Sequence, residues 1–106
     1  MAYQFQLSPR ALADLDTIWS YIALGSVRAA NRVEASILSA CSNLAHHPLQ
    51  GTVRESITSR PLRFWTVSRY PNFVIVYRPD LSPLRVVAVL HGKRDLQSVL
   101  DEPGEF

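Results

Sequence analysis

The sequence predicts an α+β fold in which a helical hairpin covers one face of a small, mostly antiparallel β-sheet. Residues 9–47 contain two amphipathic stretches with apolar residues every three or four positions, the spacing of helices. Residues 62–91 contain three short apolar runs separated by turn residues, which is typical of a β-meander. An alternating stretch precedes the helices, so the predicted order is β-α-α-β-β-β.

The first strand and helix are predicted from residues 3–25. Residues 3–7 alternate aromatic or apolar side chains with glutamine, which indicates a half-buried strand. Ser8 can then cap a helix that has Pro9 in its first turn, where the missing N–H of proline costs nothing. An apolar stripe over residues 11–22 continues this helix as far as Gly25, a typical C-terminal stop.

The second helix is predicted between Ser26, a second N-cap, and Pro48. Its apolar stripe runs from residue 33 to residue 44. Because only one or two residues join the helices, we expect an antiparallel hairpin. In the loop that follows, Gly51 is free to adopt a positive φ.

Three strands follow at residues 62–67, 73–77 and 84–91. Residues 86–90 (VVAVL) have no polar member, which predicts an inner strand covered on both faces. Residues 95–100 can form a short helix, and residues 101–106 are expected to fray. We expect residues 1–106 to form a single domain.

One register sorts the strand side chains best, with Phe73, Ile75, Tyr77, Val86, Ala88 and Leu90 facing the helices. The opposite face would then carry Arg63, Trp65, Val67, Val74, Val76, Arg78, Arg85, Val87, Val89 and His91. We therefore expect this face to be uncovered, apolar at its centre and rimmed by arginine. A surface of that kind is typical of a binding site for another macromolecule.

Composition indicates a soluble cytosolic protein with a basic segment. The single cysteine cannot form an internal disulfide, and no run approaches the ~18 apolar residues of a membrane span. The net charge is only +2, but residues 51–94 carry eight cations against two acids. Ten of the eleven cations are arginine, which favours an acidic protein or nucleic acid as partner; a codon bias toward arginine would explain the same count.

The motifs of hydrolases, metal sites and phosphate loops are absent from the sequence, so we expect no metal and no cofactor. Cys41 lies on an apolar helical stripe, as a core thiol would. His46 and His47 are adjacent and lack the i, i+4 spacing of helical metal ligands. We read them as a solvated helix end.

A metal-independent nuclease would need a general acid, a general base and cations near the phosphate. His91, Arg63 and Arg78 are the right kinds of residue, although each also has a structural explanation. Trp65, lying among arginines, could stack on a base or contribute to a protein interface. We favour the protein interface, and direct nucleic-acid binding stays open.

Four phrases occur in order over nearly the whole chain: FQLSPRALADLDTIWSYIA, ILSACSNLAHHPLQG, PLRFWTVSRYPNFVIVYRP and VVAVLHGKRDLQSVL. In these phrases the chain resembles the RelE/ParE toxin superfamily, particularly its ParE branch. The resemblance implies a bacterial type II toxin–antitoxin system, with a small ParD-like antitoxin encoded next to the toxin. It also implies DNA gyrase as the target of a ParE-like toxin, whereas RelE-like toxins cut mRNA on the ribosome.

The resemblance also suggests which residues act. RelE-like nucleases use basic residues across the sheet and a tyrosine or histidine pair behind the last strand, but here the segment after His91 has no tyrosine. We therefore expect a toxin that acts by binding, with a ribosome-dependent endoribonuclease or an inactive antitoxin-binding relative as alternatives. The residues expected to bind the target or the antitoxin are Arg63, Trp65, Arg78, Arg85, His91, Lys93 and Arg94.

Overall fold

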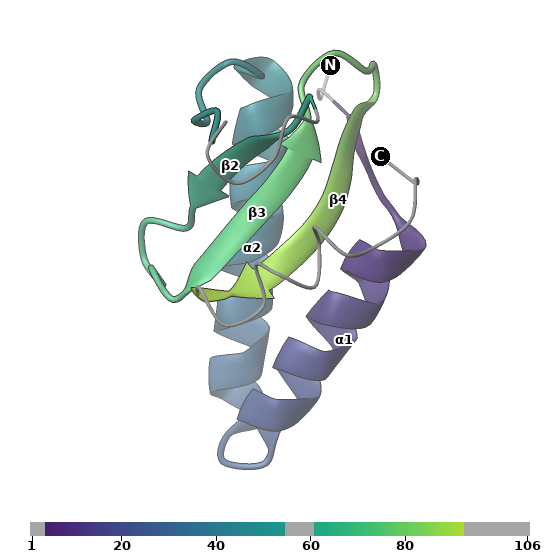
Figure 1. The fold of residues 1–106 in the computed structure, drawn as a ribbon. Coiled ribbons are helices and arrows are strands. Elements are labelled where there is room, and N and C mark those ends of the chain that lie inside the picture. Colours follow the sequence, from purple (N-terminus) through teal and green to yellow (C-terminus); the bar gives the residue numbers. More distant parts are fainter. Residues whose placement is uncertain (1–3, 55–60, 93–106) are drawn as a thin grey trace.

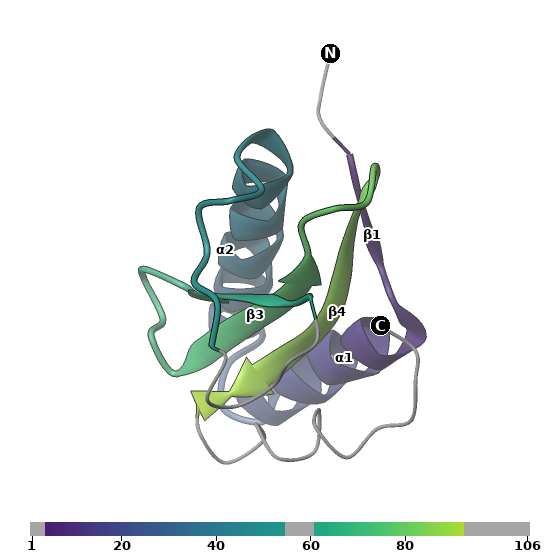
Figure 2. The same cartoon turned by 45° about the horizontal axis from the view of Figure 1, so that its top comes forward.

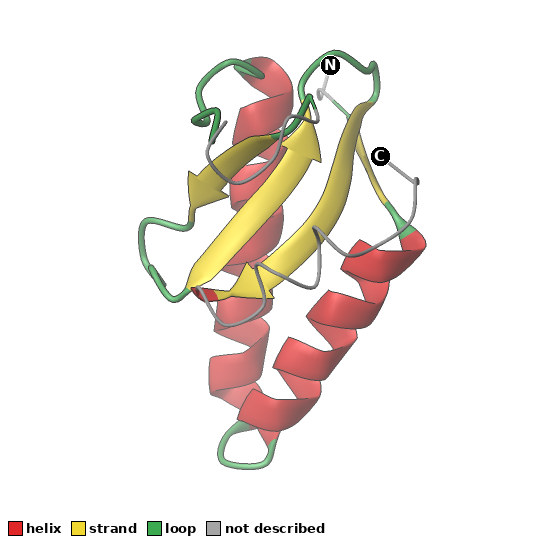
Figure 3. Cartoon of the chain, in the orientation of Figure 1, coloured by secondary structure: helices red, strands yellow, loops and turns green. Residues whose placement is uncertain are grey.

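A computed structural model describes residues 4–54 and 61–92 and confirms the predicted α+β order (Figures 1 and 3). The elements are β1 (Phe5–Leu7), α1 (Pro9–Ala23), α2 (Val27–His46), β2 (Arg63–Thr66), β3 (Phe73–Arg78) and β4 (Leu84–His91). The helix predicted at residues 95–100 and the tail predicted to fray at residues 101–106 lie outside the described residues.

The four strands form one sheet in the order β1-β4-β3-β2. β1 runs parallel to β4, and the other two pairings are antiparallel. Both helices lie on the same face of this sheet and pack against each other as a hairpin (Figure 2). Neither helix is long and apolar enough to cross a membrane.

β4 is the inner strand that its unbroken apolar sequence predicts. It lies between β1 and β3, and its residues from Val86 to Leu90 are at most 4% exposed. On the helix side, Val86 and Val89 join a core with Ile37 and Cys41 of α2. On the other side, Val87, Ala88 and Leu90 pack with apolar residues of β2 and β3.

The predicted register is wrong in the second half of β4. Val76 pairs with Ala88 and Tyr77 pairs with Val86, so Val87 is an extra residue in β4 and forms a bulge. Because a bulge reverses the alternation of side chains, Ala88 and Leu90 face away from the helices. Val89 and His91 consequently face the helix side, opposite to the prediction.

The predicted facing of β2 is also wrong. Arg63 pairs with Tyr77 and Trp65 with Ile75, so these two residues share the helix-facing side of the sheet, and Val67 joins the core on that side. Phe64 instead lies on the far face. That face is not uncovered either, because its apolar members are at most 9% exposed and are therefore buried by the chain itself: Leu62, Phe64, Val74, Val76, Val87, Ala88 and Leu90.

Both predicted N-caps form, in different surroundings. The Ser8 hydroxyl accepts a hydrogen bond from the N–H of Ala11 at 3.0 Å and donates to the carbonyl of Val87 at 2.6 Å. Ser8 is only 7% exposed and so joins the start of α1 to the bulge of β4. The Ser26 hydroxyl accepts from the N–H of Ala29 at 3.0 Å and is exposed.

Replacing Ser8 by alanine is therefore expected to cost more stability than the same change at Ser26. Ser26→Ala removes an exposed cap, worth about 1 kcal/mol. Ser8→Ala removes a cap and also leaves the buried carbonyl of Val87 without its donor, for a total of about 2–3 kcal/mol. Urea denaturation of both variants measures the difference, and equal losses would contradict the role assigned to the Ser8–Val87 bond.

Candidate interaction surface

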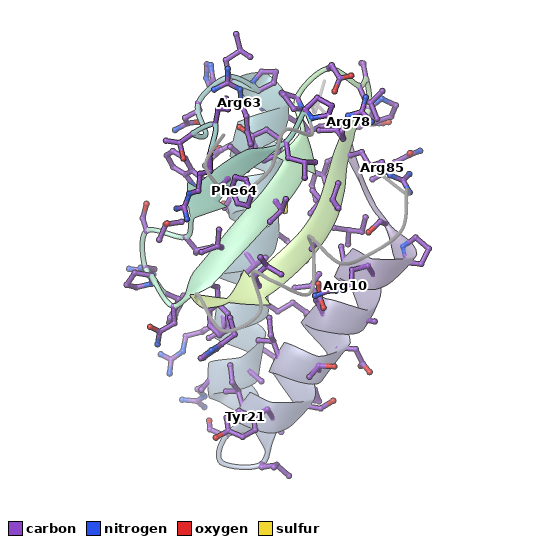
Figure 4. All side chains as sticks on the ribbon, in the orientation of Figure 1. Arg10, Tyr21, Arg63, Phe64, Arg78 and Arg85 are labelled. Carbon is purple, nitrogen blue, oxygen red and sulfur yellow. The ribbon has the colours of Figure 1, made fainter. Side chains whose placement is uncertain are left out.

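Three strands bring three arginines to one end of the sheet. Arg63 begins β2, Arg78 ends β3 and Arg85 is the second residue of β4. The antiparallel register places Arg63 beside Tyr77 and Arg78 beside Arg85. We call this group of three the arginine end. It lies away from the turn of the helical hairpin, where Tyr21 is found (Figure 4).

Arg78 is held in a two-bond ion pair with Asp80. Its Nε lies 2.8 Å from Oδ1 and its Nη2 lies 2.5 Å from Oδ2 of that carboxylate. The hydrogen bond from Arg78 lowers the pKa of Asp80, so both groups are charged at neutral pH. Arg85 faces Arg78 across the strands, and like charges in that position repel. Asp80 offsets this repulsion and fixes the direction of the Arg78 guanidinium.

Arg63 holds the loop that follows α2. Its Nη1 donates to the carbonyl of Gly51 at 2.7 Å and to that of Leu49 at 3.3 Å. The Tyr77 hydroxyl completes the attachment, because it donates to the carbonyl of Pro48 at 2.6 Å and accepts from the N–H of Gly51 at 2.9 Å. Two side chains of the sheet therefore fix the backbone of residues 48–51.

Gly51 is required by this close approach. A Cβ built on it would lie 2.6 Å from the Tyr77 hydroxyl and 2.9 Å from the carbonyl oxygen of Phe64. Gly51 does not use its freedom to adopt a positive φ, since among the described glycines only Gly92 does, with φ 57°. Position 51 therefore requires glycine because there is no room for a side chain, and not because its backbone conformation is unusual.

Tyr77 faces the helices as predicted and is a structural residue of the core. Burial raises the pKa of its hydroxyl above the ordinary value, so the group stays neutral. Both of its hydrogen-bonding roles are taken by the backbone of residues 48–51. The available signal was that a tyrosine inside an apolar strand needs a partner for its hydroxyl, but the sequence does not say which loop supplies it.

The remaining residues predicted for the site lie elsewhere. Trp65 lies on the helix side, in a groove between β2 and α2. His91 lies at the far end of the sheet, with its ring edge-on to Phe73 at 5.3 Å. Lys93 and Arg94 lie outside the described residues. The prediction of one surface shared by these groups and the arginines is wrong for Arg63, Trp65 and His91, which lie on the helix side of the sheet.

The same geometry separates the residues considered for a nuclease. His91 pairs with Phe73 and Arg63 pairs with Tyr77, which is four residues further along β3. Four residues of a strand span about 13 Å. Arg78 lies on the opposite face of the sheet from both. These three side chains therefore do not gather around one phosphate.

Asp14 is the other polar contact that sequence reasoning missed. Its carboxylate accepts from the N–H of Val89 at 2.9 Å and from Nε of Arg10 at 2.9 Å, which ties α1 to the edge of β4. Asp14 and His91 line a largely apolar hollow of about 400 Å³ between α1 and the sheet. Within residues 4–54 and 61–92, no three His, Cys, Asp or Glu side chains group to hold a metal ion.

The fold and the surface define a class of protein: a small α+β molecule with three arginines at one end of its sheet. The structure titled "Chromosomal ParDE TA system from P. aeruginosa" has this fold, with a TM-score of 0.71 and 22% sequence identity over 87% of this chain and 98% of the other. No curated protein matches the sequence. A family model described as the ParE toxin of the type II toxin–antitoxin system, parDE, matches residues 5–96. The chain belongs to this ParE toxin family.

Proposed function

We propose that this chain is a toxin that inhibits DNA gyrase in the bacterial cytoplasm and is neutralised by a small ParD-like antitoxin encoded beside it. The match to the ParE toxin family over residues 5–96 is the observation that carries the proposal. The matched structure is of a ParDE system, which supports an antitoxin as partner. The arginine end supports action by binding, because fixed guanidinium groups grip carboxylates on another protein.

The alternative of a ribosome-dependent endoribonuclease has less support. It needs His91, Arg63 and Arg78 to act on one phosphate, and they lie at two ends and on two faces of the sheet. An inactive relative that only binds the antitoxin would present the same fold. An activity assay is therefore needed to distinguish the gyrase inhibitor, the endoribonuclease and the inactive relative.

A supercoiling assay separates them. Purified toxin added to gyrase, relaxed plasmid and ATP is expected to reduce supercoiling or to accumulate cleaved DNA, and the co-purified antitoxin should reverse the effect. Absence of both effects would rule out gyrase as the target. Cleavage of mRNA in expressing cells, lost in His91→Ala, would favour the nuclease, whereas harmless expression without antitoxin would favour the inactive relative.

Arg85→Ala is expected to weaken gyrase inhibition by about tenfold or more, as arginines central to an interface do. Arg85 is half-buried and its partner across the sheet is Arg78, so its removal relieves repulsion inside the toxin and should not lower stability. Arg28→Ala is the matched control, because Arg28 is an exposed cation at the start of α2. Equal inhibition by wild type and Arg85→Ala would remove Arg85 from the binding surface.

A further inference from the structure

A hollow of about 590 Å³ lies beside the arginine end, between the C-terminal end of α2 and the β3–β4 turn. Its walls are mixed: Ala45, Pro48, Pro79, Leu81 and Pro83 supply apolar groups, and Gln4, Asp80 and Ser82 supply polar ones. Three of the seven prolines of the chain thus line this hollow. Proline has a fixed φ, so these walls need little ordering when a ligand enters.

Two residues of the arginine end are bonded to groups in or next to the hollow, although none of the described arginines lines it. Asp80, which lines it, is bound by Arg78 through two hydrogen bonds. Pro48 lies in the loop that Tyr77 and Arg63 fix to the sheet. The arginine end and Asp80 together carry three cations and one acid, with Arg63 on the helix side of the sheet and Arg78 and Arg85 on the other side. The surface is thus a preformed hollow with mixed walls, next to a group of residues with a net positive charge.

Two leucines project from this region into solvent. Leu49, in the fixed loop, is 70% exposed, and Leu81, in the β3–β4 turn, is 39% exposed. The loop that carries Leu49 is held by hydrogen bonds from Arg63 and Tyr77, but these bonds leave the Leu49 side chain exposed to solvent. An exposed apolar side chain on a loop that is already ordered loses little entropy on binding, which is typical of an interface position.

We propose that this hollow is where the toxin grips its protein target, and that the gripped segment carries an apolar side chain flanked by carboxylates. The apolar side chain would enter between Leu81 and the prolines, while the carboxylates would pair with the arginine end. The inference rests on the proposed function, since it assigns a surface to the contact with gyrase. On this inference, the toxin needs the apolar contact as much as the charged contacts in order to bind gyrase.

A protein segment fits this surface better than nucleic acid does. Single-stranded nucleic acid is gripped by exposed aromatic rings that stack on bases, together with cations. The described walls of the hollow have no aromatic ring, and the nearby rings of Phe64 and Tyr77 are at most 2% exposed. Walls that combine small apolar residues with a few polar groups are instead typical of sites that take a side chain.

The test compares two charge changes at Leu81 in the supercoiling assay. Leu81→Asp and Leu81→Lys are both expected to raise the toxin concentration for half inhibition by at least tenfold, because either charge keeps an apolar side chain out. Leu49→Asp, on the opposite side of the region, should act in the same direction. Leu24→Asp is the control, since Leu24 is 86% exposed at the hairpin turn, and it should inhibit as wild type does.

Each other outcome overturns a different statement. If wild type inhibits gyrase and Leu81→Lys inhibits as well or better, the contact is electrostatic and the apolar grip is wrong. If the Leu81 variants lose only antitoxin binding, measured by biolayer interferometry, the hollow belongs to the antitoxin and the inference is again wrong.

If wild-type toxin binds labelled duplex DNA as tightly as it binds gyrase, the partner is nucleic acid and not a protein. A wild type without effect on gyrase overturns the proposed function, and this inference with it.

Discussion

Replacing Gly51 by alanine is expected to lower the free energy of unfolding by about 3 kcal/mol or more. The new methyl group would lie 2.6 Å from the Tyr77 hydroxyl and 2.9 Å from the carbonyl oxygen of Phe64. Overpacking of this kind costs about 1–3 kcal/mol, and the displaced tyrosine would also lose its bonds to Gly51 and Pro48. For a domain of this size the melting temperature should fall by about 15 °C.

Gly25→Ala is the matched control for that experiment. The nearest atom to a Cβ at Gly25 is the carbonyl oxygen of Ile22 at 3.8 Å, an ordinary contact, and the backbone there does not have a positive φ. Its stability should stay the same or rise by about 0.5 kcal/mol through the lower entropy of the unfolded chain. Urea denaturation of both variants decides the matter, and equal stability would show that the loop can shift away from Tyr77.

The fold could be predicted from the sequence because its signals are local. Ser8 and Ser26 mark helix starts by residue type, and the unbroken run of residues 86–90 identifies an inner strand without any knowledge of its neighbours. The helices and strands were placed to within a few residues for the same reason. Each of these signals depends on residues close together in the chain.

The surface could not be predicted to the same extent, because one bulged residue decides which face a side chain occupies. Nothing in the sequence distinguishes Val87 from its valine neighbours. The bulge at Val87 nevertheless places the side chains of Val89 and His91 on the opposite face from the predicted one. The shared face of Arg78 and Arg85 was predicted correctly, since both lie before the bulge in the β3–β4 pairing. The role of Arg63 depends on the loop at residues 48–51, a contact that local sequence does not encode.

Stability should also fall steeply in alkali because of Cys41, whose side chain is buried on α2. Desolvation by burial raises the pKa of this thiol from 9.0 to about 12. Below pH 9 the thiol is protonated in both the folded and the unfolded chain, so it adds no pH dependence. Between pH 9 and 12 the unfolded chain loses the proton while the folded chain keeps it, and each pH unit favours unfolding by about 1.4 kcal/mol.

Urea denaturation at pH 8, 9, 10 and 11 should therefore show the wild type losing about 2 kcal/mol from this residue between pH 9 and 11. Cys41→Ala should be less stable at pH 8, because it leaves a small cavity in the core, but its loss in alkali should be smaller by that amount. Tyr77 also has a raised pKa and adds a loss above its ordinary value of 10.0, which Tyr77→Phe removes separately. Parallel curves for wild type and Cys41→Ala would mean that the folded chain releases the thiol proton as readily as the unfolded chain does.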